Sequence, residues 1–264
     1  VPSASSTAAA FSAIDLATSN SAIAIPAAQG MALVEVEPGR RTMPTAVFYQ
    51  VEGLEAHEEP ARLYGRRGPG AHLHGEEVVA VLSRMGKVAA ATTATALIER
   101  FRVDRILFTG VAGGLAQGVQ RGDVVVADAF LQHDLDASPL FPRYEVPLYG
   151  TGRFATDPDL TEQLAVAVRR ALHGAHVHRG LVVSGDRFVA SAAESQLLQQ
   201  ALPDALAVEM EGAAFAQVCR DYGVPFAAVR TVSDRADDAA HGDFLSFIDR
   251  VASRHSAAIV EAFL

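Results

Sequence analysis

Residues 105–114 read Arg-Ile-Leu-Phe-Thr-Gly-Val-Ala-Gly-Gly, and this stretch decides the fold class. Its first half is a short apolar run rich in strand-forming residues, which is typical of a strand buried inside a sheet. Glycines follow, and the pair Gly113-Gly114 predicts a tight turn after the strand. We therefore expect a buried strand over 105–109 that brings a glycine-rich turn to one edge of a sheet.

Outward from this stretch, strand-like and helix-like segments alternate as far as the C-terminus. Residues 87–101 are rich in alanine and contain neither Gly nor Pro, which favours a helix, and Asp157-Pro158 is typical of a helix start. Alternation of this kind indicates a layered α/β fold. The expected strands are 78–83, 105–109, 123–127, 181–184, 205–208 and 225–232, and the expected helices are 87–101, 158–172, 192–201, 211–222 and 243–263.

The chain shows neither an internal repeat nor an interdomain linker after Gly75, which predicts a single domain over residues 1–264. Residues 1–74 are atypical within it. There Ser, Ala, Thr, Pro and Gly alternate with short apolar runs, and the periodicity is poor.

The composition excludes several classes of protein. Half of the 264 residues are apolar, which is ample for a buried core, and the net charge of −9 has the wrong sign for a protein that tracks phosphates. The single cysteine, Cys219, excludes an intramolecular disulfide framework and fits a reducing, cytoplasmic compartment. Because no apolar run reaches the ~18 residues of a membrane span, we expect neither a membrane nor nucleic acid as a partner.

Polar and glycine-rich segments follow four of the expected strands. In such sheets ligands gather at the carboxyl ends of the strands, so these segments are the candidate site. Their convergence is more informative than any one of them. The four segments are 110–114, 184–189, 209–212 and 233–234.

Each segment also has a purely structural interpretation. The glycine turn lacks the spacing of a dinucleotide-binding or P-loop motif. Glu209 and Glu211 stand at a strand-to-helix junction, where acids cap a helix and complement its dipole. Ser233-Asp234 fits a turn or helix cap in the same way. Without further context, capping is the favoured interpretation of the two glutamates.

The histidines and the cysteine do not predict a metal site. His72, His74 and Glu76 lie close in sequence, as do His176 and His178, but no third ligand is fixed by spacing. Cys219 lies in an apolar helical segment and is expected in the core. We therefore expect no metal.

Residues 208–214, Val-Glu-Met-Glu-Gly-Ala-Ala, and 229–234, Val-Arg-Thr-Val-Ser-Asp, carry the most specific pattern in the chain. With the blocks at 86–90, 109–114, 122–126 and 184–188, they resemble the purine nucleoside phosphorylase and nucleosidase superfamily, above all its 5′-methylthioadenosine/S-adenosylhomocysteine nucleosidases. The resemblance runs from Gly75 to Leu264. It implies a three-layer α/β fold with a central mixed β-sheet flanked by helices. It also implies hydrolysis of 5′-thio-substituted adenosines to release adenine, as in methionine salvage, without a cofactor.

The resemblance assigns roles to the candidate residues. Asp234 would be the general acid that protonates adenine N7, Ser233 would orient it, and Glu211 would accept hydrogen bonds from the ribose hydroxyls. The residues placed around the rest of the nucleoside are Phe188 stacked on adenine, the Val189 backbone at the adenine edge, Met210 on the ribose face, Ala112 and Gly113 at the glycine-rich strand end, and Met85 and Phe244 in the alkylthio pocket.

The same resemblance also bears on the oligomeric state of the protein, through the segment after the expected strand 123–127. Residues 130–153 form a long, irregular, proline-containing segment, and loops of that length usually carry function or an interface. By resemblance, the part around Ala137 and Leu140 would reach the pocket of a partner subunit. A homodimer is therefore expected.

Two positions bear on the nucleophile. Phosphorylases of this superfamily carry an Arg before the glycine turn and a Ser within it to hold phosphate, and the matching positions are Phe108 and Val111. Neither side chain binds an anion, which favours water as the nucleophile. Several of the nucleosidases keep a serine at the Val111 position, so Val111 is a departure from them as well.

The N-terminus departs further from the family. There the family carries a strand followed by a Met-Glu-Glu stretch, one of whose glutamates activates water. Here Gln29-Gly30-Met31 follows the matching strand, and Glu52 and Glu55 are candidates with poor spacing. We favour an altered or artefactual segment over a relocated glutamate. Alternatives are a phosphorylase, a nucleosidase for another purine nucleoside, and a nucleoside-binding protein without catalysis.

Overall fold

The computed structural model describes residues 24–27, 30–33, 71–73, 76–78, 81, 83, 85–237, 240 and 253–264. Phe244 and the candidate bases Glu52 and Glu55 therefore lie outside the described residues, as does most of the atypical segment 1–74. Two short antiparallel pairs of strands are described before residue 80. They are β1 (Ala24–Ala27) with β2 (Gly30–Leu33), and β3 (Ala71–Leu73) with β4 (Glu76–Val78).

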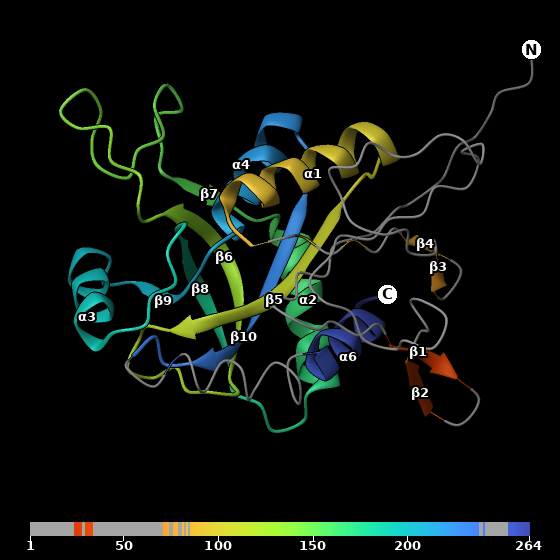
Figure 1. The fold of residues 1–264 in the computed structure, drawn as a ribbon. Coiled ribbons are helices and arrows are strands. Elements are labelled where there is room, and N and C mark those ends of the chain that lie inside the picture. The colour runs from red at the N-terminus through yellow and green to blue at the C-terminus, as the bar shows by residue number, and fades with distance from the viewer. Residues whose placement is uncertain are drawn as a thin grey trace, which may run out of the picture.

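A six-stranded mixed sheet forms the centre of the described structure, as expected (Figure 1). β5 pairs in parallel with β10, and β8 pairs in parallel with both β6 and β9, whereas β5–β9, β6–β7 and β6–β10 are antiparallel. Because β10 pairs with both β5 and β6, the sheet curls and closes on itself. The strands are β5 (Ile106–Gly114), β6 (Val124–Gln132), β7 (Arg153–Ala155), β8 (Val177–Ser184), β9 (Ala205–Glu209) and β10 (Phe226–Asp234).

Helices cover the sheet on two sides, which completes the three layers (Figure 1). One side carries α1 (Lys87–Phe101) and α4 (Gly212–Tyr222), which pack on each other. The other carries α2 (Pro158–Ala171) and α6 (Ser253–Phe263), which also pack together. α3 (Ala192–Ala201) lies at the end of the sheet near β9.

Local sequence explains where the helices begin and end. The Asp157 carboxylate accepts the N–H of Leu160 at 2.9 Å, with Pro158 in the first turn, so the predicted start of α2 is confirmed. The Ser191 hydroxyl caps α3 in the same way. α4 ends where Gly223 adopts a left-handed conformation, φ 66°, which closes a helix without strain at a glycine.

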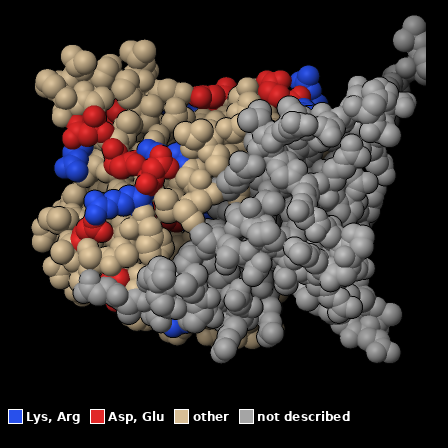
Figure 2. Space-filling view, viewed as in Figure 1, with Lys and Arg blue, Asp and Glu red and all other residues tan. Residues whose placement is uncertain are grey.

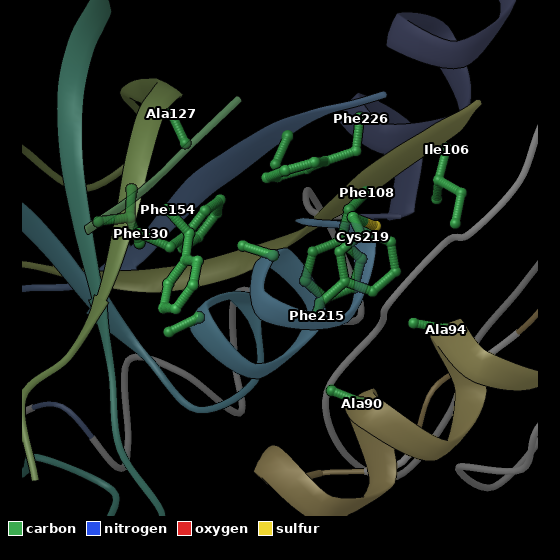
Figure 3. Close-up of a cluster of buried hydrophobic side chains, with 14 of the residues drawn as sticks. Ala90, Ala94, Ile106, Phe108, Ala127, Phe130, Phe154, Phe215, Cys219 and Phe226 are labelled. Atoms are coloured by element: carbon green, nitrogen blue, oxygen red, sulfur yellow. The ribbon is translucent and has the colours of Figure 1, made fainter. Parts of the chain in front are cut away.

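Aromatic rings fill the space between the sheet and the α1–α4 layer (Figure 3). Phe108 stacks on Phe215 with ring centroids 4.5 Å apart, and Phe226 meets Phe215 edge-on at 5.9 Å. Cys219 is fully buried in this cluster, and burial raises the pKa of its thiol. Its predicted place in the core is confirmed.

The structure differs from the sequence-based expectation in several places, among them the lengths of β6 and β8, which extend beyond the predicted 123–127 and 181–184. The tight turn predicted at Gly113-Gly114 is wrong: β5 continues through both glycines, which pair with Val208 and Ala207 of β9. In the predicted strand 78–83, β4 ends at Val78, and Val81 and Ser83 are buried but not in a strand. The short strand β7 was not expected, because its three residues lie in the proline-containing segment and give no pattern.

The described part of the surface in Figure 2 mixes acidic and basic side chains without a continuous basic patch. Among the described residues, no helix is long and apolar enough to cross a membrane.

Candidate active site

A pocket of about 450 Å³, including its part open to solvent, lies where four strands end. The last residues of β5 pair with those of β9, and β8 and β10 end beside them, so the four carboxyl ends meet. Nine of the ten predicted site residues line this pocket, and the tenth, Phe244, lies outside the described residues. The nine are Met85, Ala112, Gly113, Phe188, Val189, Met210, Glu211, Ser233 and Asp234.

Asp234 ends β10 and is only 2% exposed. Ser233 Oγ donates to its Oδ2 at 2.7 Å, and the N–H of Ala236 donates to its Oδ1 at 2.8 Å. A Cβ on Gly113 would lie 2.9 Å from Oδ1, so only a glycine lets the carboxyl group approach β5 this closely. Asp234 is thus fixed in position from three directions within a buried wall.

Glu211 lies at the junction of β9 and α4 and is 3% exposed. Its Oε1 accepts the N–H of Gly86 at 2.7 Å, at the start of α1. Gly86 has φ +96°, a conformation that side-chain-bearing residues rarely adopt. The N-terminal end of α1 favours negative charge, so it stabilises the Glu211 carboxylate beside the pocket.

Glu209 is the residue whose contacts the sequence did not reveal. Its carboxylate accepts the N–H groups of Gly212 at 2.8 Å and of Glu211 at 3.2 Å, so the capping interpretation is correct for Glu209. It also accepts the hydroxyl of Ser184 and pairs with Arg230 Nη2 at 2.9 Å. A buried arginine inside an apolar strand needs a buried partner, and that signal was available in the sequence at Arg230.

The segment after β8 forms another wall. Phe188 is 37% exposed and lines the pocket, as does the buried Val189 that follows it. Arg187 also lines the pocket, a position that the sequence analysis did not select, and its guanidinium pairs with Glu194 at the start of α3. Met85 and Met210 add flexible apolar surface.

The two positions that bear on the nucleophile separate in space. Val111 lines the pocket, whereas Phe108 is fully buried against Phe215 and is not part of the pocket wall. The wall therefore presents an aliphatic side chain where a phosphate ligand would need a donor.

Burial and hydrogen bonds shift the pKa values of two ionisable side chains in the segment after β6, His133 and Asp134. Burial lowers the pKa of His133, so its imidazole is neutral at neutral pH. Burial alone would raise the pKa of Asp134, but hydrogen bonds from the Lys87 side chain and from the Asp186 backbone bring it below its usual range. Within the described ranges, no three His, Cys, Asp or Glu side chains gather as a metal ion would require.

Comparisons with known proteins agree with this geometry. A family model described as "Phosphorylase superfamily" matches residues 52–264, so the match begins before Gly75, where the resemblance had been expected to start. A 5′-methylthioadenosine/S-adenosylhomocysteine nucleosidase of Chromohalobacter salexigens is 36% identical over 222 residues, which are 83% of this chain and 94% of that protein.

Solved structures give the same result. The enzyme of that name from Neisseria meningitidis, in complex with methylthio-immucillin-A, is 30% identical with a TM-score of 0.70 over 96% of this chain and 97% of that one. The futalosine hydrolase of Helicobacter pylori is 25% identical with a TM-score of 0.72 over 98% of each chain. From its fold, its pocket and these matches, the chain belongs to the phosphorylase superfamily and, within it, to the family of 5′-methylthioadenosine/S-adenosylhomocysteine nucleosidases.

Proposed function

We propose that this protein hydrolyses the N-glycosidic bond of 5′-thio-substituted adenosines, methylthioadenosine and S-adenosylhomocysteine, and releases adenine. The observation that carries the proposal is the convergence of Asp234, Glu211 and Phe188 in one pocket. These three supply an acid, an anion and an aromatic face. A nucleoside needs one of each: a proton for its base, negative charge near its sugar and a stacking surface.

The proposed chemistry follows the charges. As the bond between C1′ and N9 breaks, its electron pair moves to the base, and Asp234 delivers a proton to N7, so adenine leaves neutral. The sugar becomes cationic, and the buried Glu211 carboxylate stabilises it while accepting hydrogen bonds from the ribose hydroxyls. Water then adds to C1′ and releases its proton to solvent, and Asp234 regains a proton from solvent, so the cycle balances. Ser233, which donates to Asp234 Oδ2, orients the acid.

The remaining predicted residues are proposed to position the substrate. Adenine would stack on Phe188, with its edge read by the Val189 backbone, and the ribose would pack on Met210. Ala112 and Gly113 would bound the base beside Asp234. Met85 and Phe244 would enclose the 5′ substituent.

The nucleophile can be tested directly. We expect the ribosyl product to be the free sugar whether or not phosphate is present, because Val111 offers no donor for a phosphate oxygen. Adenine release from methylthioadenosine is measured with and without phosphate, and the sugar product is identified. A dominant ribose-1-phosphate product would make the chain a phosphorylase, and binding without turnover would make it a nucleoside-binding protein.

A second substrate class is favoured by one comparison. The likeness to the futalosine hydrolase covers 98% of both chains, so a nucleosidase for another purine nucleoside is the alternative. Methylthioadenosine, S-adenosylhomocysteine and futalosine are therefore compared as substrates. Their relative kcat/KM values decide between the two.

We further propose a homodimer that acts in the cytoplasm in methionine salvage. Leu140 and Leu148 in the segment between β6 and β7 are 85% and 91% exposed, an apolar surface that a partner subunit would cover. The expected result is a dimer in sedimentation, with weaker ligand binding after dilution below its dissociation constant. A fully active monomer would contradict the proposal.

A further inference from the structure

Three residues next to the pocket, Lys87, Asp134 and Asp186, form a closed ring of hydrogen bonds through side chains and backbone N–H groups. Lys87 Nζ donates to Asp134 Oδ1 at 2.7 Å, and the N–H of Asp186 donates to Asp134 Oδ2 at 2.9 Å. The ring closes because the N–H of Lys87 donates to Asp186 Oδ1 at 2.7 Å. It ties together the start of α1, the segment after β6 and the segment after β8, which are far apart in the sequence.

The ring adjoins pocket residues on two sides. Asp186 stands two residues before Phe188, and Gly86, next to Lys87, donates its N–H to Glu211. Two successive amides at the start of α1 therefore bind one carboxylate each. The first N–H groups of a helix have no partner within it, so these two carboxylates fix where α1 begins. If the start of α1 shifts, the Gly86 amide leaves Glu211.

Lys87 extends the same connection to α4. Its Nζ also donates to Gln132 Oε1 at 3.1 Å, and Gln132 Nε2 donates to Gln217 Oε1 at 2.9 Å. Gln217 lies on α4, the helix that Glu211 precedes. One ammonium group thus links the two helices that approach the ribose carboxylate.

The identity of the basic residue is informative. Lys87 is the only lysine among the 22 basic residues of the chain, and the other 21 are arginines. Its side chain is 17% exposed, and Nζ reaches two acceptors on neighbouring residues, Gln132 and Asp134. A compact ammonium group with three rotatable donors can do this, whereas a planar guanidinium needs more space.

We infer that Lys87, Asp134 and Asp186 are positioning residues, which hold the Gly86 amide against Glu211 and thereby set the affinity for the ribose hydroxyls. The inference rests on the proposed role of Glu211 as the ribose-binding group. It predicts that breaking the ring weakens the binding only of ligands that carry those hydroxyls.

Lys87→Met tests this, because methionine keeps most of the length and removes the charge. We expect kcat/KM for methylthioadenosine to fall by about 10²-fold, the loss typical when a positioning contact shifts by about 1 Å. Affinity is compared for adenosine and 2′,3′-dideoxyadenosine, which differ only in the two hydroxyls. Adenosine should bind more weakly to the variant, and the dideoxy compound should bind as it does to the unaltered protein.

Arg179→Met is the matched control, since it breaks exposed ion pairs to Asp128 and Glu162 at 2.8 and 2.6 Å and should change neither affinity. Equal losses for both nucleosides, or no loss for either, would overturn the inference. If Lys87→Met fails to fold, Asp134→Asn removes the opposite charge of the pair and should give the same selective loss. The binding comparison needs no turnover, so it stays decisive even if the unaltered protein does not hydrolyse methylthioadenosine.

Discussion

Replacing Asp234 with Asn is expected to lower kcat by about 10²–10⁴-fold, the usual contribution of a general acid. The amide has the shape of the carboxyl group but cannot give up a proton to adenine N7. The N–H of Ala236 can still donate to the amide oxygen, and the Ser233 hydroxyl can accept from the amide nitrogen while it donates to the Ala112 carbonyl, so the side chain should keep its place. KM should change far less than kcat, because stacking and ribose contacts are left intact.

Steady-state release of adenine from methylthioadenosine measures this effect. Asp204→Asn is the matched control: it removes a carboxylate of the exposed Arg153–Asp204 pair and should leave kcat unaltered. Unchanged turnover in Asp234→Asn would remove this residue from the mechanism. A rise in KM with little change in kcat would instead make it a binding residue.

The location of the site could be predicted from the sequence, because polar residues follow the ends of the expected strands. Ser184, Glu209 and Ser233 each stand at the end of an apolar run, and such runs end at one edge of a sheet. The resemblance of the motifs around Glu211 and Asp234 to the family then predicted the role of each residue. Both line the pocket.

What escaped prediction depends on contacts between distant segments. The two glutamates of Glu209-Met210-Glu211 are alike in sequence and both line the pocket, yet Glu209 ends β9 and caps α4, whereas Glu211 lies beyond the strand and its carboxylate accepts the Gly86 N–H instead. The continuation of β5 through Gly113 was missed for a similar reason. Those glycines read locally as a turn, whereas their role is to admit Asp234 and to pair with β9.

The second large effect concerns Arg230, whose side chain is completely buried. Its Nη2 pairs with Glu209 at 2.9 Å, its Nη1 donates to the carbonyl of Val229 at 3.1 Å, and its guanidinium carbon lies 4.0 Å from the centre of the Phe108 ring. Arg230→Met would leave the Glu209 carboxylate buried without its cation. Removing one partner of such a pair typically costs about 3–5 kcal/mol of unfolding free energy, and we expect a loss of that size.

Chemical denaturation of Arg230→Met and Arg179→Met provides the comparison. Both changes remove a guanidinium from an ion pair of similar N···O distance, 2.9 Å for Arg230–Glu209 and 2.8 Å for Arg179–Asp128. The Arg179 side chain is 40% exposed, however, so its loss should cost under about 1 kcal/mol of unfolding free energy. The double variant Arg230→Met, Glu209→Gln removes the buried negative charge that Arg230→Met leaves without a partner. The amide oxygen of the introduced glutamine can still accept the N–H of Gly212, so the double variant should be more stable than Arg230→Met alone. Equal losses for the two arginines would show that burial of the Arg230–Glu209 pair does not govern its contribution.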